Sequence, residues 1–128
     1  MFAPLLLNLV ELEPDDALYL PAGELHAYLE GTAIEVMASS DNVLRGGLTP
    51  KHVDVAELLV VGAFRPAPPG AFRPVAVSPV ERVYRTPAAE FELGLLGVAR
   101  GAPFVAPAER SGELLLALAG VGLGRKPA

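Results

Sequence analysis

Residues 18–51 read LYLPAGELHAYLEGTAIEVMASSDNVLRGGLTPK, and this stretch decides how the whole chain is interpreted. It places ionisable side chains inside short apolar runs that glycine and proline interrupt. Ionisable groups are costly to bury unless another group pairs with them. Several of them packed among apolar residues therefore indicate a functional site.

The first group of candidate residues lies on a strand that the alternation over residues 25–30 predicts. On a strand His26, Tyr28 and Glu30 point to one face, and the apolar residues between them point to the other. A neutral imidazole on such a face suits a zinc-type metal. The alternative is a buried histidine bonded to a backbone carbonyl. Because catalytic zinc usually has three protein ligands, a histidine without other candidate ligands nearby favours this alternative.

Glu35 is the second candidate. It interrupts the apolar run 32–38, and its same-face neighbours on a strand are Ala33 and Met37. A carboxylate in that setting needs a compensating metal or cation if it is buried. The alternative is an edge strand on which Glu35 reaches water. The local pattern leaves both interpretations open.

A carboxylate and two cations follow in the polar segment 39–51. Asp41 and Arg45 stand four residues apart, so a helical turn would pair them. The pair is either an ordinary surface contact or a support that holds the guanidinium toward a substrate. Lys51 is either a solvated lysine or, beside an arginine, a phosphate ligand. His52, next to a predicted helix, is assigned to structure or solvent exposure.

The composition excludes several classes of protein. The 128 residues are enough for one domain of ordinary size. The chain has no cysteine, which excludes disulfides, thiolate metal sites and a cysteine nucleophile and fits a cytoplasmic location. A net charge of -5 without a basic run argues against a nucleic-acid partner. No signal peptide is expected, and no apolar run is long enough to span a membrane.

The organisation predicts a mainly β fold with one helix. The expected strands cover residues 5–12, 17–20, 25–30, 32–38, 81–85, 90–99 and 113–123. Short strands separated by turn residues indicate an antiparallel sandwich or barrel. Glu13, Pro14, Asp15 and Asp16 form a turn, and Asp54 caps a helix over residues 53–64. The Pro-rich residues 65–79 are expected to form an extended linker or a clasp.

The chain is unusually apolar for its size. Apolar residues make up 52% of it and the mean hydropathy is +0.41, although it also contains 13 Gly and 13 Pro. We expect part of its surface to be covered, either by another chain in a homo-oligomer or by a further part of a longer polypeptide.

Two motifs in this stretch resemble one known family. Residues 21–28, PAGELHAY, look like the histidine-bearing strand of a cupin. Residues 35–51, EVMASSDNVLRGGLTPK, are similar to type I mannose-6-phosphate isomerases, and the run 40–51 is highly specific to them. The strong match covers roughly residues 7–60. The resemblance implies a cupin-like antiparallel β-sandwich or jelly roll. It implies a cupin segment over residues 1–64, the linker 65–79, and part of a second cupin segment over residues 80–128. Together these segments would form an incomplete double cupin.

The resemblance also implies an activity, the zinc-dependent interconversion of mannose 6-phosphate and fructose 6-phosphate. It implies that His26 is a zinc ligand and that Tyr28 and Glu35 line the pocket. It implies that Arg45 is the catalytic arginine, and that Asp41 is also a catalytic residue, which holds the Arg45 side chain in place. Lys51 is then expected near the substrate phosphate.

This sequence departs from the family in one respect. The family's other zinc ligands, a Gln-x-His pair and a glutamate, lie upstream of the matched region, and this chain has no glutamine. We therefore expect a C-terminal catalytic portion with little or no activity alone. The alternatives are a non-catalytic cupin module that binds a sugar phosphate, and a structural or interaction domain.

Overall fold

The computed structural model describes residues 7–40, 43–47, 49–66, 68, 70–107 and 109–120. The chain divides into two compact units, Met1–Gly97 and Val98–Ala128. The helix and all the strands of the described residues belong to the first unit. The boundaries expected at residues 64 and 80 stay predictions.

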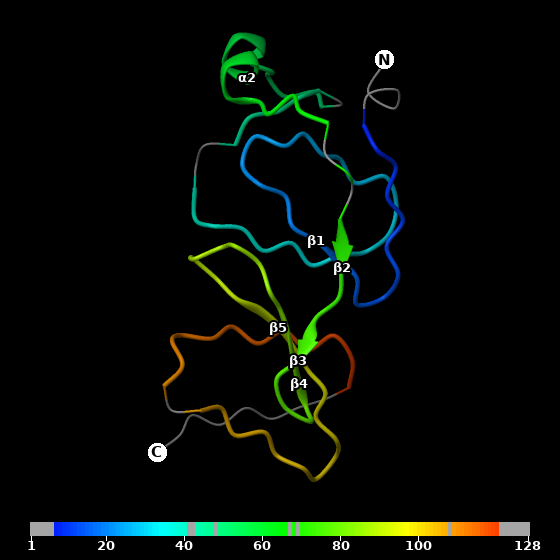
Figure 1. Cartoon of the computed structure of the whole chain (residues 1–128), viewed down its shortest axis with the longest axis vertical. Helices are drawn as coiled ribbons and strands as arrows, with labels where there is room; N and C mark the ends of the chain where they lie inside the picture. Colours follow the sequence, from blue (N-terminus) through cyan, green and yellow to red (C-terminus); the bar gives the residue numbers. More distant parts are fainter. Residues whose placement is uncertain are drawn as a thin grey trace. The chain divides into compact units, whose positions relative to one another are not determined.

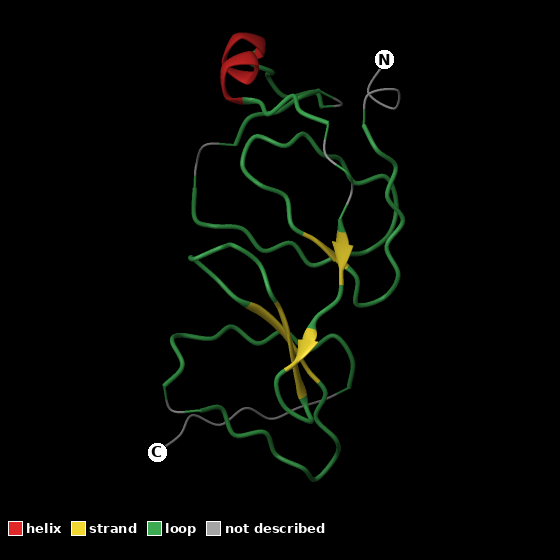
Figure 2. Cartoon of the chain, viewed as in Figure 1, coloured by secondary structure: helices red, strands yellow, loops and turns green. Residues whose placement is uncertain are grey.

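The first unit is built from short antiparallel strands and one helix (Figures 1 and 2). In chain order the elements are β1 (Ala17–Leu18), α2 (Val55–Val61), β2 (Ala71–Phe72), β3 (Val75–Ala76), β4 (Glu81–Tyr84) and β5 (Leu93–Leu96). One sheet pairs β1 with β2, and the other has the order β3-β4-β5. The predicted class, mainly β with antiparallel pairing and one short helix, is confirmed, and it is consistent with a cupin-like β fold.

The centre of the first unit is the middle strand β4. Val83 and Tyr84 are buried, and Glu81 on the same strand is buried as well. Val83 lies opposite Val75 on β3 and Gly94 on β5, so β4 is covered by a neighbour on each side. Neighbours on both sides also pair the backbone groups of β4, which an edge strand would leave unpaired on one side.

The predicted turn before β1 is confirmed in detail. The Asp16 N–H donates to the Glu13 carbonyl at 2.9 Å, and the Asp16 Oδ2 accepts from the Glu13 N–H at 3.1 Å. Asp15 takes the left-handed conformation, φ 71°, which aspartate tolerates better than most residues.

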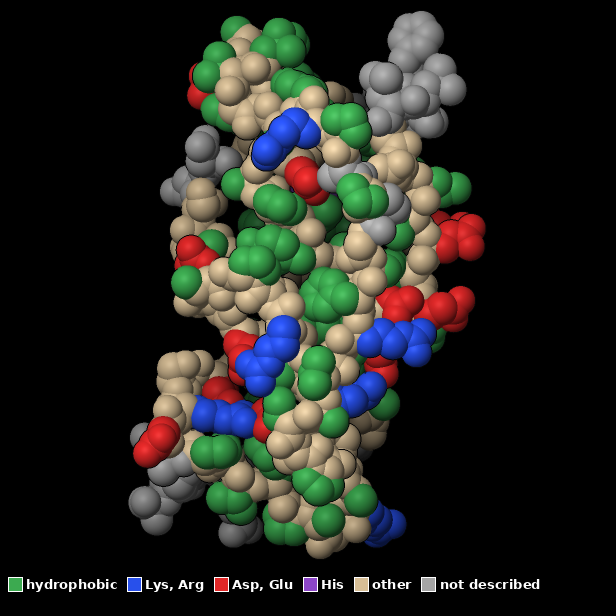
Figure 3. Space-filling model, viewed as in Figure 1, with side chains coloured by type: hydrophobic (Ala, Val, Ile, Leu, Met, Phe, Trp, Pro, Cys, Tyr) green, Lys and Arg blue, Asp and Glu red, His purple; other side chains and the backbone are tan. Residues whose placement is uncertain are grey.

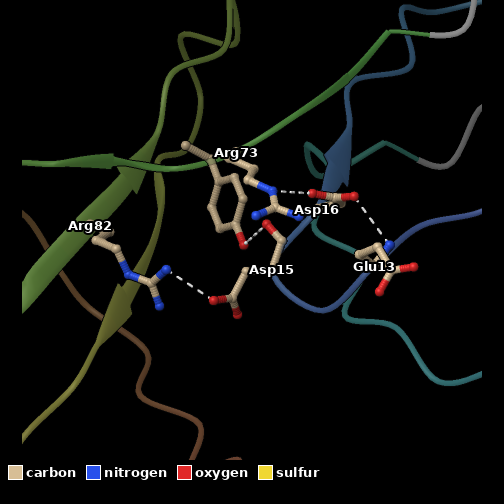
Figure 4. A network of polar contacts seen from close by, with 6 residues as sticks. Glu13, Asp15, Asp16, Arg73 and Arg82 are labelled. Atoms are coloured by element: carbon tan, nitrogen blue, oxygen red, sulfur yellow. Dashed lines mark hydrogen bonds and ion pairs between the residues drawn. The ribbon is translucent and has the colours of Figure 1, made fainter.

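This turn is tied to the sheets by a network of polar contacts (Figure 4). The Arg73 Nε, just after β2, lies 2.7 Å from the Asp16 Oδ1. Arg82 on β4 reaches the Asp15 Oδ2 at 2.9 Å, and the Tyr84 hydroxyl donates to the Asp15 carbonyl at 3.0 Å. The turn thereby contacts both sheets of the first unit. The sequence pattern does not predict these pairs, because the residues are 57 to 69 positions apart.

The helix prediction is confirmed, with Asp54 as its N-cap: the Asp54 Oδ1 accepts from the Glu57 N–H at 3.0 Å. The strand predictions were too generous. Within the described residues, 7–12, 25–30, 32–38 and 113–120 form no strand, and the expected strands 17–20, 81–85 and 90–99 shorten to β1, β4 and β5. Alternating side chains define a face, but a strand exists only where a second segment supplies hydrogen-bond partners.

Much apolar surface stays exposed, including side chains on α2 (Figure 3). Leu59 and Val60 of the helix are 65% and 78% exposed, and Leu29 is 77% exposed. None of the helices in the described part of the chain is long and apolar enough to cross a membrane.

Candidate active site

His26 is oriented by a backbone carbonyl two residues before it. Its Nδ1 lies 3.1 Å from the Glu24 carbonyl oxygen. A carbonyl oxygen only accepts hydrogen bonds, so in the neutral imidazole this contact places the proton on Nδ1. The Nε2 lone pair is then free to accept a proton or to bind a metal. The carbonyl contact that the alternative interpretation expected is therefore present, but the side chain is 42% exposed rather than buried.

Glu35 lies on the open side of this imidazole. Its Oε1 is 4.0 Å from the His26 Nε2, and its side chain is 53% exposed. The carboxylate therefore reaches water, as the second interpretation of Glu35 expected, although residues 32–38 do not form the edge strand that it assumed. It also faces the nitrogen that the Glu24 carbonyl leaves unprotonated. These two groups can present two donor atoms to one cation.

Tyr28 completes this cluster. Its ring meets the His26 imidazole edge-on, with centroids 5.9 Å apart and planes at 72°. Desolvation, and after it a hydrogen bond and the negative charge of Glu35, raise the pKa of the Tyr28 hydroxyl above 10.0. The phenol therefore stays protonated at neutral pH and can donate a hydrogen bond. The structure brings His26, Tyr28 and Glu35 together although their segment forms no strand.

The Arg45 segment lies against the segment that carries His26. A β-carbon at Gly46 would lie only 2.8 Å from the Leu25 Cδ2, so the Leu25 side chain packs against the Gly46 backbone. Arg45 itself is exposed. Asp41, its expected partner, lies outside the described residues. The Arg45 segment thus contacts the residue before His26 through Gly46, while the role of Arg45 and its pairing with Asp41 stay predictions.

Lys51 is exposed and its backbone N–H donates to the Thr49 Oγ1 at 3.2 Å. No contact that the structure gives joins it to the histidine cluster. His52 is exposed, as the sequence analysis assigned it. The roles expected of Lys51, Arg45, Glu35, Tyr28 and His26 all stay predictions.

The described residues offer a metal ion few donors. Among them, no group of three or more His, Asp or Glu side chains is arranged to hold a metal ion. The His26 Nε2 and the Glu35 Oε1 make two, whereas a catalytic zinc usually has three protein ligands. The described part of the chain therefore fits at most part of a zinc site.

The groups that orient His26 are backbone groups, so a search for ionisable side chains does not find them. The Glu24 carbonyl orients His26, and Gly23 before it contacts the end of α2: the Ala63 N–H donates to the Gly23 carbonyl at 2.9 Å. The sequence signal was the Pro21-Ala22-Gly23 break, which predicted a turn but not its contact with the helix.

Curated proteins similar to this chain carry one name. It is 57% identical over 70 residues to "Mannose-6-phosphate isomerase" of Salmonella typhimurium, covering 55% of this chain and 18% of that protein. It is 42% identical over 115 residues to "Mannose-6-phosphate isomerase 1" of Arabidopsis thaliana, covering 90% and 27%. The rat protein "Mannose-6-phosphate isomerase" is 49% identical over 67 residues, covering 52% and 16%.

The chain thus spans about a quarter or less of the length of these relatives. No family model matches it, and no solved structure matches it.

Proposed function

We propose that this chain, which belongs by sequence to the mannose-6-phosphate isomerase family, forms one wall of a site that interconverts mannose 6-phosphate and fructose 6-phosphate. The observation that carries the proposal is the cluster of His26, Tyr28 and Glu35, with the Arg45 segment packed beside it through Gly46. A sugar phosphate as substrate also supports a cytoplasmic location.

Aldose–ketose exchange moves a proton between neighbouring carbons through an enediol. It needs a base and a positive group for the oxyanion that develops. We assign the base to Glu35, whose carboxylate is open to solvent on the side of the His26 Nε2. Arg45 keeps its charge at any physiological pH and stabilises the oxyanion. Tyr28 donates a hydrogen bond to a substrate oxygen, and Lys51 binds the phosphate.

His26 is the proposed zinc ligand, through Nε2. Zinc, when bound, would polarise the sugar oxygens. The described residues supply at most two donors to the zinc, so its further ligands would come from polypeptide outside this chain. The roles given above to the other residues do not depend on the metal. We expect the pure 128-residue chain to have little or no isomerase activity.

The test is a binding titration of the pure chain followed by NMR, with mannose 6-phosphate, mannose and inorganic phosphate as probes. Mannose 6-phosphate should bind more tightly than either part alone. Arg45→Ala should weaken it roughly tenfold or more, since a charge-assisted hydrogen bond contributes about 1.5–3 kcal/mol. Arg65→Ala, at another exposed arginine, is the matched control. Equal affinity of the two variants would refute the role of Arg45, and efficient turnover by the pure chain would refute its incompleteness.

The small number of metal donors in the described residues favours a second function, that of a non-catalytic module that binds a sugar phosphate. Mixing the chain with the polypeptide that makes up the remainder of the Arabidopsis relative separates the two. Isomerase activity in the mixture that Arg45→Ala abolishes supports the catalyst. Binding of mannose 6-phosphate without turnover in the mixture supports the module.

A further inference from the structure

The turn before His26 connects the end of helix α2 to the imidazole. We propose that Gly23 is a positioning residue: its contact with the end of α2 holds the Glu24 carbonyl, which in turn selects the His26 tautomer with a free Nε2. The inference rests on the proposed function for its purpose, since it is the free Nε2 that would bind a metal. The geometry itself does not depend on that function.

The first link joins α2 to Gly23. Gly23 has φ +87°, a conformation that side chains disfavour. A β-carbon there would lie 2.8 Å from the Val61 carbonyl oxygen and 3.2 Å from the Ala63 nitrogen. Both are backbone atoms, so neither can rotate out of the way. The Ala63 N–H also donates to the Gly23 carbonyl at 2.9 Å, and the two segments are in direct contact at this point.

The second link joins Gly23 to His26. Glu24 follows directly, and its N–H closes the turn by donating to the Pro21 carbonyl at 3.3 Å. Its carbonyl accepts from the His26 Nδ1 at 3.1 Å. A backbone shift at Gly23 therefore moves the oxygen that fixes the ring. Partners of this kind, behind a metal-binding histidine, set its tautomer and orientation.

The experiment measures the tautomer of His26 directly, by ¹⁵N NMR of the two imidazole nitrogens in the metal-free chain. The chain contains only two histidines, so His52 serves as an internal reference. Gly23→Ala should lose the preference for a proton on Nδ1 at His26 and leave His52 unchanged. The matched control is Gly31→Ala: Gly31 also has a positive φ, +108°, but a β-carbon there meets nothing within 4 Å. An unchanged His26 tautomer in folded Gly23→Ala would overturn the proposal.

A second variant decides the matter if Gly23→Ala fails to fold. Ala63→Pro removes the N–H that bonds the Gly23 carbonyl and leaves Gly23 intact. Gly62 before it has ψ 135°, which suits the residue preceding a proline. The His26 tautomer should shift in the same direction by a smaller amount, and no shift would contradict the proposal.

Zinc affinity, measured on the same variants, tests the proposed function separately. If it falls in Gly23→Ala and not in Gly31→Ala, both proposals are supported. Because the described residues supply at most two donors, zinc affinity is measured in the mixture with the polypeptide that makes up the remainder of the Arabidopsis relative. A tautomer that shifts, with no measurable zinc affinity in that mixture, would support the positioning role and contradict the metal role of His26.

Discussion

Asp16 holds the turn before β1 through both of its carboxylate oxygens. One accepts from the Arg73 Nε at 2.7 Å and the other from the Glu13 N–H at 3.1 Å. The Arg73 hydrogen bond first, and the Glu13 backbone bond second, lower the pKa of Asp16 below 3.8. Both contacts favour the ionised carboxylate. The ionisation state of Asp16 thus determines the strength of the contact between the turn and Arg73, which follows β2.

We expect Arg73→Gln to raise the pKa of Asp16 back toward its usual value, because it removes the largest cause of the shift. A ¹³C NMR titration of the Asp16 carboxyl carbon measures this. The sequence offers a close control, because Arg65 and Arg73 occupy the same place in two copies of Ala-Phe-Arg-Pro. Arg65→Gln should leave the titration midpoint unchanged. The same midpoint in both variants would mean that the Arg73 pair does not form in solution.

The direction of the shift also fixes the pH dependence of this contact. The folded-state pKa of Asp16 lies below its unfolded value, near 3.9. The contact therefore stabilises the chain above about pH 4, and this contribution is lost as the pH falls through the folded-state value.

Tyr84 makes a different contact with the same turn. It is only 7% exposed, and its hydroxyl donates to the Asp15 carbonyl at 3.0 Å. Tyr84→Phe keeps the ring and its edge-on contact with Phe72 but removes the hydrogen bond. We expect the opening free energy of β4 to fall by about 1 kcal/mol. Amide hydrogen exchange at β4 measures it. Tyr19→Phe, at a 37% exposed ring, is the control, and equal protection in both variants would contradict the role of the hydroxyl.

At the scale of elements, the helix was predicted and the strands only in part: β1, β4 and β5 lie within predicted strands, whereas β2 and β3 lie in the segment predicted as a linker. Helix α2 is specified locally, since Asp54 caps the N–H of Glu57 three residues on. A strand is specified by its neighbour: β1 exists where Ala17 lies opposite Phe72, and no local pattern encodes that pairing. For the same reason the residue types of the site were predictable, but the orienting contacts through Gly23 and Glu24 were not.

The cap gives a prediction for the helix itself. Asp54→Ala should reduce helix stability by about 1 kcal/mol, because it leaves the Glu57 N–H without its partner. Hydrogen exchange of the α2 amides and the far-UV circular dichroism signal report the change. The comparison variant is Val60→Ala, which removes a side chain that is already 78% exposed and should cost the helix far less. If the two variants fray α2 equally, the cap is not what holds its first turn.

At the scale of the molecule, the described residues bury little apolar surface. Among the described residues, Val83 and Tyr84 alone form the buried apolar core. In the second unit Leu114 is 97% exposed. Much apolar surface is thus exposed, and its cover by another chain or by a further part of a longer polypeptide stays a prediction.

Little buried surface predicts weak cooperativity, because the dependence of unfolding free energy on urea scales with the surface that unfolding exposes. Small proteins show slopes of about 1–3 kcal/mol/M in urea, and we expect this chain alone to lie below about 1 kcal/mol/M. Urea titrations followed by circular dichroism measure the slope. The paired experiment adds the polypeptide that completes the Arabidopsis relative, which should steepen the transition if that polypeptide covers the apolar surface. A sharp transition of the chain alone, with a slope near 2 kcal/mol/M, would show that it forms a full core without any cover.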